Sequence, residues 1–154
     1  LLHAKAKDRI LSFWRELLQL HRLDRIAEHR KPARKSEPPL PPGIGADMRT
    51  ETLKVIEEVV FDPTRDFREI FDSRATWVNR PLAALYGLPG DVPDTGFVRV
   101  AIPEGQPRVG ILGHASFLAL HAHEGSSSPT RRGKFIREVL LCQAVPPPPP
   151  NVSA

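Results

Sequence analysis

Residues that could do chemistry gather late in the sequence, after a serine–proline step. Ser128 followed by Pro129 is typical of a helix N-cap with proline at the first helical position. The next turn carries three cations where the helix dipole favours anions. It also carries a glycine, which costs about 1 kcal/mol relative to alanine inside a helix. Two unfavourable features in one turn predict an anion-binding site. Its predicted residues are Ser128, Arg131, Arg132, Gly133 and Lys134.

These cations also have an explanation within the chain. Residues 1–46 hold 10 Lys and Arg against 5 Asp and Glu, residues 47–96 hold 6 against 10, and residues 97–154 hold 6 against 3. Basic ends can therefore fold against an acidic middle. The basic turn then pairs either with carboxylates of residues 47–96 or with an anion from outside the chain, such as a haem propionate, a phosphate or an acidic substrate.

Three histidines and one cysteine complete the reactive side chains of this region. His121 and His123 could ligate a metal from an extended segment, with His114 nearby in sequence. Because no cysteine accompanies them, the sequence predicts ordinary hydrogen-bonded histidines and no metal site. Cys142 closes an apolar helical face, so we expect it to be a small buried side chain.

Hydrophobic periodicity predicts a mainly α fold, an irregular helical bundle with one small β element near residues 96–112. Alternation over 96–102 predicts a strand, and a hairpin with 108–112 is its expected partner. A basic, proline-rich connection is expected over 29–45. The predicted helices cover residues 4–20, 47–61 (capped by Asp47), 67–71, 80–86 (between Asn79 and Gly87), 111–120 and 129–141.

Composition excludes several classes of protein. The formal net charge is +4, but the cations form no continuous stripe, so nucleic-acid binding is not expected. No run approaches the roughly 20 apolar residues that span a bilayer. The sequence starts within a helical pattern and ends just after five consecutive prolines, Pro146 to Pro150. We therefore expect a part of a longer polypeptide.

Several segments together resemble two tandem domains of unknown function from large exported proteins of planctomycete and myxobacterial type. Residues 13–24, 57–71 and 77–88 resemble the first domain; residues 110–119, 128–135 and the proline tract resemble the second. The resemblance implies three parts. Residues 1–90 are the C-terminal part of a helical domain, 91–145 are a second helical domain, and 146–154 are a polyproline linker.

The resemblance also implies a setting. In such proteins a cytochrome-c-like domain often lies upstream, and a haem-attachment Cys-x-x-Cys-His segment follows the prolines; this sequence contains neither. It implies a periplasmic or cell-envelope location and haem c in neighbouring domains of the same polypeptide, with no cofactor in this chain. No catalytic residue carries over.

Three functions remain open. The first is a non-catalytic scaffold and docking module that supports electron transfer by a neighbouring haem domain. The second is part of an oxidative or hydrolytic enzyme whose active site is completed outside the chain. The third is a binding module for an acidic envelope polymer.

Overall fold

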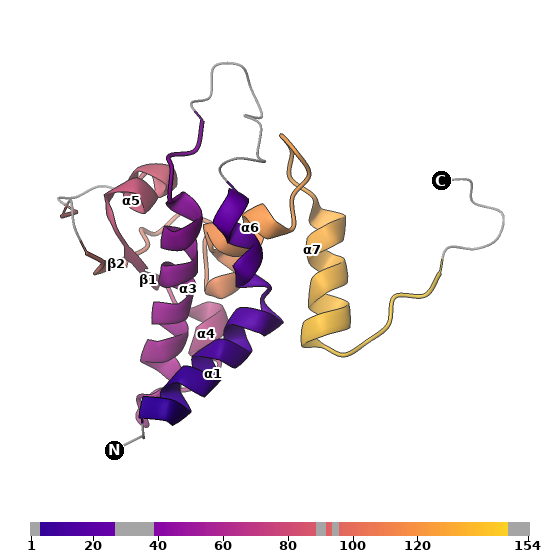
Figure 1. The fold of residues 1–154 in the computed structure, drawn as a ribbon, viewed down its shortest axis with the longest axis horizontal. Coiled ribbons are helices and arrows are strands. Elements are labelled where there is room, and N and C mark those ends of the chain that lie inside the picture. Colours follow the sequence, from indigo (N-terminus) through magenta and orange to yellow (C-terminus); the bar gives the residue numbers. More distant parts are fainter. Residues whose placement is uncertain (1–3, 27–38, 89–91, 94–95, 148–154) are drawn as a thin grey trace.

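The structure of the protein is a computed structural model. Most of the molecule consists of helices that pack around one long central helix (Figure 1). The structure describes residues 4–26, 39–88, 92–93 and 96–147. The elements are α1 (Ala4–Leu17), the 3-10 helix η1 (Leu20–Arg25), α3 (Ile44–Val60), α4 (Glu69–Asp72), β1 (Ala75–Val78), α5 (Arg80–Tyr86), β2 (Val98–Ala101), the 3-10 helix η2 (Ile111–Gly113), α6 (Ala115–Leu120), α7 (Pro129–Phe135) and the π-helical turn η3 (Ile136–Leu140).

The predicted fold class, mainly α with one small β element, is confirmed. The strand near residue 100 exists as β2, but the expected hairpin with 108–112 is wrong. β2 pairs antiparallel with β1, in a register that places Ala75 opposite Ala101 and Val78 opposite Val98. The chain between the two strands forms α5, whose cap Asn79 and left-handed Gly87 are both as predicted.

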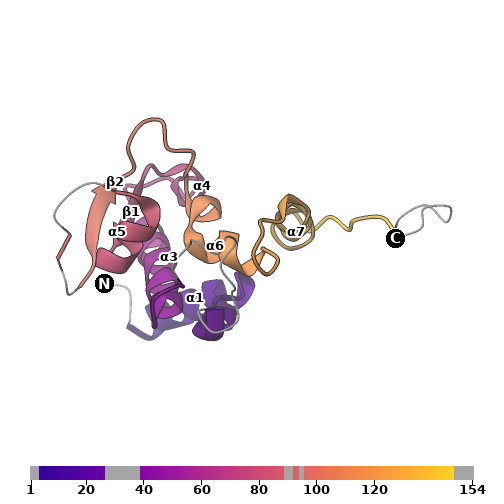
Figure 2. The same ribbon diagram turned by 90° about the horizontal axis from the view of Figure 1, so that it is seen from above.

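Helix α3 organises the core. It contacts α1, η1, α4, β1, α5 and α6, and Figure 2 shows these elements gathered around it. Its buried stripe includes Met48, Val55, Ile56 and Val59. The sequence predicts burial of this helix through Leu53, Ile56 and Val60; Ile56 is buried as predicted, but Leu53 and Val60 are only half-buried. The helix is therefore rotated relative to the predicted face.

The start of α3 also differs from the prediction. Helical structure begins at Ile44, after Gly43 in a left-handed conformation, so Asp47 lies in the first turn and does not cap the helix. Gly45 therefore belongs to the helix, not to the expected connection. Residues 27–38 of that connection lie outside the described residues.

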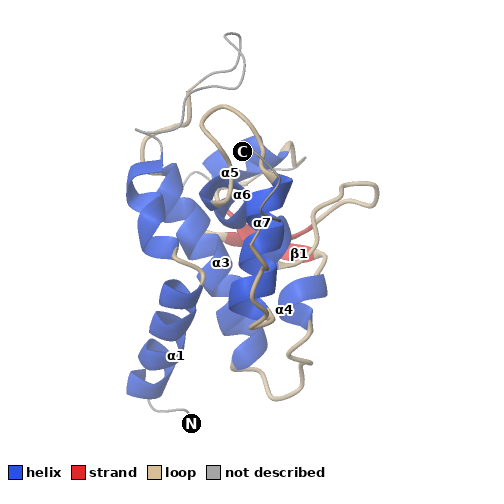
Figure 3. Ribbon diagram, turned by 90° about the vertical axis from the view of Figure 1, so that its right-hand side faces the viewer, coloured by secondary structure: helices blue, strands red, loops and turns tan. Residues whose placement is uncertain are grey.

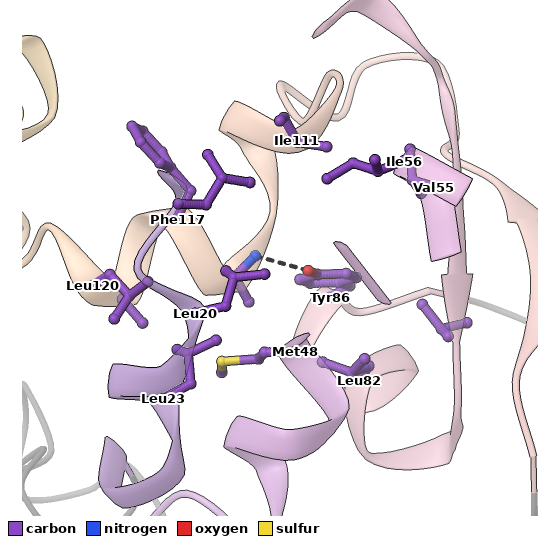
Figure 4. Packing of buried hydrophobic residues seen from close by; sticks show 14 of the residues in the cluster. Leu20, Leu23, Met48, Val55, Ile56, Leu82, Tyr86, Ile111, Phe117 and Leu120 are labelled. Carbon is purple, nitrogen blue, oxygen red and sulfur yellow. Dashed lines mark hydrogen bonds between the residues drawn. The ribbon is translucent and has the colours of Figure 1, made fainter. Parts of the chain in front are cut away.

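A single hydrophobic cluster runs from Trp14 in α1 to Phe135 in α7. Figure 4 shows part of it, with Leu20 and Leu23 facing Met48, and Tyr86 among apolar side chains. Hydrophobic periodicity predicts that Phe13 shares one face of the first helix with Ile10, Trp14, Leu17 and Leu18, but 59% of Phe13 is exposed. The predicted division at residues 90/91 stays a prediction. The observed cluster contains residues from both sides of it.

Gly45 provides a test of helix packing because its hydrogen faces the backbone of η1. A Cβ there would collide with the carbonyl oxygen of Leu23, whereas a Cβ on Gly133 would meet nothing within 4 Å. We expect Gly45→Ala to lower the free energy of unfolding by about 1–3 kcal/mol, as overpacking does. Gly133→Ala, the matched control, is expected to raise it by up to about 1 kcal/mol. Urea unfolding followed by circular dichroism measures both; equal effects would contradict the packing of α3 on η1.

Candidate functional site

Helix α7 begins as the sequence predicts. Ser128 is the N-cap, its hydroxyl oxygen accepts a hydrogen bond from the backbone N–H of Arg131 at 3.4 Å, and Pro129 occupies the first turn. Ser128 itself is buried, with 4% exposed. Its hydroxyl is therefore used to cap the helix.

Beyond this cap, the other predicted anion-binding residues lie in different surroundings. Arg131 Nη1 donates to the carbonyl oxygen of Ala122 at 3.0 Å. Lys134 lies 3.9 Å from the Glu138 carboxylate one turn later. The side chain of Arg132 makes no hydrogen bond or ion pair with any described residue, and Gly133 is exposed with open space beside it. No cation of this turn pairs with a described carboxylate of residues 47–96. Whether these cations meet a carboxylate of this chain or an anion from outside it stays a prediction.

An open cleft of about 520 Å³ lies beside this helix. Its apolar lining is Ile26, Ala119, Leu120 and Ala122. Its polar lining is His21, Arg22, Asp24, Arg25, His123, Glu124 and Arg131. Arg131 is thus the one predicted anion-binding residue that lines it, and the arginines of η1 are the partners that sequence reasoning missed. Nothing local marks them, because η1 and α7 are more than a hundred residues apart in the chain.

The loop between α6 and α7 is held in place by short-range bonds. His123 and Ser126 form an isolated antiparallel bridge, with the His123 N–H donating to the Ser126 carbonyl at 2.9 Å. Gly125 between them has φ 73°, a left-handed conformation that glycine adopts without steric cost. This turn fixes Ala122, and through its carbonyl the Arg131 guanidinium.

The three candidate histidines lie in three different surroundings. His114 is in the core, His121 lies between aromatic rings, and His123 is exposed. Within the described residues no group of three or more His, Cys, Asp or Glu side chains is arranged to hold a metal ion. Cys142 was expected to be buried and is exposed, because the chain leaves the body of the protein after η3.

His121 joins α7 to the body. Its ring centroid lies 4.7 Å from that of Phe117 in α6 and 4.3 Å from that of Phe135 in α7. Its Nε2 is buried and has no hydrogen-bond partner among the described residues. Burial, followed by the charges of Arg22 and Arg132, lowers the pKa of His121 to about 4. The side chain is therefore neutral at pH 7 and packs as an aromatic ring.

A second group of polar side chains lies entirely inside the protein. The Glu51 carboxylate of α3 has no exposed surface. Its Oε1 accepts from the Thr76 hydroxyl of β1 at 2.7 Å, and its Oε2 accepts from the Tyr86 hydroxyl of α5 at 2.6 Å. The Tyr86 oxygen in turn accepts from the backbone N–H of Ala115 at 2.8 Å, the bond drawn dashed in Figure 4. Burial, followed by Glu51, raises the pKa of Tyr86 far above its usual value.

His114 extends this network to α6. Its Nε2 lies 3.4 Å from the Thr76 hydroxyl and its Nδ1 lies 3.2 Å from the Thr52 hydroxyl, which is 2.7 Å from the Ser116 hydroxyl. Burial lowers the pKa of His114 in spite of the opposing charge of Glu51. A neutral ring protonated on Nε2 satisfies these side-chain contacts, with the single Thr52 proton directed to Nδ1 in place of the Met48 carbonyl at 3.1 Å: Ser116 donates to Thr52, Thr52 to Nδ1, Nε2–H to Thr76, and Thr76 to Glu51.

One feature of the sequence could have predicted part of this network. Glu51 and Thr52 lie in the same stripe of α3 as Met48, Val55 and Ile56. A carboxylate in an apolar stripe requires buried donors. The donors themselves come from β1, α5 and α6, so their identity depends on the tertiary fold.

Thr52 and Thr50 form a matched pair for testing the network. Both hydroxyls lie within hydrogen-bond distance of a backbone carbonyl one turn earlier on α3, but only Thr52 also contacts His114 and Ser116. Thr52→Val should therefore lower the free energy of unfolding by about 2 kcal/mol more than Thr50→Val, since two buried groups lose a partner. Chemical denaturation of both variants checks this. A difference below about 0.5 kcal/mol would show that the network contributes little.

His121 predicts a pH dependence. Because its pKa of about 4 in the folded protein is below the ordinary value of 6.5, the folded state resists protonation. The associated stability is complete above pH 6.5 and is lost as the pH falls towards 4. We expect the melting temperature of His121→Phe to fall less than that of the natural chain between pH 7 and pH 4.5. Parallel curves for the two proteins would contradict this role of His121.

No helix in the described residues is long and apolar enough to cross a membrane. Two family profiles match the chain. The profile PSD4, protein of unknown function (DUF1592), covers residues 1–88, and the profile PSCyt3, protein of unknown function (DUF1588), covers residues 108–154. No curated protein and no solved structure matches the chain. Because the first match spans more than half of its residues, the chain belongs to the DUF1592 family of proteins of unknown function.

Proposed function

We propose that the chain is a non-catalytic scaffold and docking module within a large exported c-type cytochrome-like protein. In this proposal it holds a neighbouring haem domain of the same polypeptide, in the periplasm or cell envelope, and so supports electron transfer by that domain. The observation that carries the proposal is a set of cations on α7 and η3, of which Lys134 alone pairs with a described carboxylate, that of Glu138 one turn later.

These cations lie on a helical segment at the edge of the molecule, which packs on the body through Phe135. Figure 1 shows α7 beside the other helices, with the C-terminal chain running away from it. Figure 3 shows α7 and η3 in front of the body. The side chains of Arg132 and Arg137 form no ion pair with described residues, and Lys134 has only Glu138 on the same helix. Exposed ion pairs of this kind contribute little to stability. The cations are therefore available to an acidic surface.

Gly133 supports the same conclusion. It lowers the intrinsic stability of α7, yet no atom of the described chain comes close enough to require a glycine. A glycine on an exposed helix allows the close approach of another backbone. A neighbouring domain that presses its main chain and its carboxylates against α7 would account for Gly133 and the cations together.

The catalytic alternative is less well supported. Glu51, His114 and Ser116 are at most 3% exposed and are linked to one another through the hydroxyls of Thr52 and Thr76, so substrate does not reach them. The cleft gathers histidines and carboxylates with Arg131, which is the arrangement an enzyme would use. However, no Ser, Thr or Cys is among its described lining residues. The name of the PSCyt3 profile favours the cytochrome setting.

Zero-length crosslinking of the whole protein tests the docking role. A carbodiimide joins an amine to a carboxylate in direct contact. We expect Lys134 to crosslink to a carboxylate outside residues 1–154, and the yield to fall at high salt. Lys7, which pairs with Glu57 in the structure, is the internal control. Crosslinks of Lys134 to Glu138 alone, with Lys7–Glu57 present, would contradict docking through α7.

The haem setting is tested separately by the visible spectrum of the whole purified protein. We expect the absorption bands of covalently bound haem c. A spectrum without them would overturn the cytochrome part of the proposal. Retention of the protein on an acidic polysaccharide matrix, lost in Lys134→Gln, would instead favour the envelope-polymer alternative.

A further inference from the structure

The cleft beside η1 combines an apolar floor with arginines at its margin. Ile26, Ala119, Leu120 and Ala122 supply the apolar part. Its volume of about 520 Å³ is within the range of small-molecule sites, about 300–1,000 Å³. A site of this size holds more than a single carboxylate, so the apolar lining would contact the rest of a ligand.

Two of its arginines bond only neutral groups. Arg22 Nη1 donates to the Gln19 side-chain oxygen at 2.6 Å, and Arg131 Nη1 donates to the Ala122 carbonyl at 3.0 Å. Each guanidinium has five N–H donors, so most remain available. Asp24 and Glu124 also line the cleft, but Asp24 is neutralised by Arg49, which does not line it.

Positive charge near the cleft also affects the neighbouring His121. Arg22 and Arg132, from η1 and α7, both contribute to lowering the pKa of His121, beyond the effect of burial. Two elements far apart in sequence thus bring cations close to the same side chain, although Arg132 itself does not line the cleft. Guanidinium groups bind carboxylates through paired hydrogen bonds, which an ammonium group cannot match.

We propose that this cleft binds an amphiphilic organic carboxylate, with its carboxylate held by Arg22 and Arg131 and its apolar body against Leu120 and Ala122. The ligand site shares Arg131 of α7 with the helix proposed for docking, and its other parts come from η1, α6 and the loop after α6. It uses neither Lys134 nor Arg137.

Calorimetric titration with decanoate, kept below its micelle concentration, tests the site. We expect decanoate to bind at least tenfold more tightly than acetate, which lacks the apolar body, and than decyltrimethylammonium, which reverses the charge. Arg22→Gln and Arg131→Gln should each weaken decanoate binding about tenfold, and Arg137→Gln, the matched control on η3, should not. In the NMR spectrum of the backbone amides, the signals of Leu120 and Ala122 should shift as decanoate is added.

Several results would overturn the inference. Equal affinity for decanoate and decyltrimethylammonium would indicate non-specific apolar binding. Equal affinity for decanoate and acetate would show that the apolar floor is not used. Equal weakening by Arg22→Gln and Arg137→Gln, with unchanged melting temperatures, would show that net charge alone governs binding. None of these results depends on haem or on crosslinking of Lys134.

Discussion

The buried carboxylate of Glu51 is the group on which the rest of the structure depends. A charge without exposed surface is tolerated only when donors surround it, and here they come from β1 and α5, with His114 before α6 linked through Thr76. Each donor fixes one element against α3. The hydrogen bond from the Ala115 N–H to Tyr86 then sets where α6 begins. The position of the cleft follows from these constraints, because α6 and the loop after it form one of its walls.

Local features were predictable from the sequence where short-range chemistry decides them. The caps of α5 and α7 follow from Asn79 and Ser128, whose side chains bond the next turn whatever the surroundings. The partner of β2 was not predictable in this way. A strand near residue 100 could pair with the segment after it, but it pairs with β1, which precedes it by more than twenty residues. The prediction of which face of α3 is buried failed for a similar reason. Glu51 is buried, although glutamate side chains are usually exposed.

The candidate site shows the same division. The sequence singled out the basic turn after Ser128, and the structure shows that its cations lack acidic partners among the described residues of the acidic middle. The sequence alone could not show that Arg131 shares a cleft with Arg22. That proximity depends on how α7 packs on α6 through Phe117, His121 and Phe135. The rigid core and the accessible cations are therefore two consequences of the same packing of the helices. The buried polar groups order the helices, and Arg131 and Lys134 of α7 are left exposed on the surface.

Hydrogen exchange of the whole protein tests most directly whether Glu51 unites these elements. If the network joins α3 to α6, the amide of Ala115 should exchange only by global unfolding, with the same free energy as the buried centre of α3 around Val55. Thr52→Val should lower both values by equal amounts. Exchange of Ala115 at a much lower free energy than Val55, unaffected by Thr52→Val, would contradict the account.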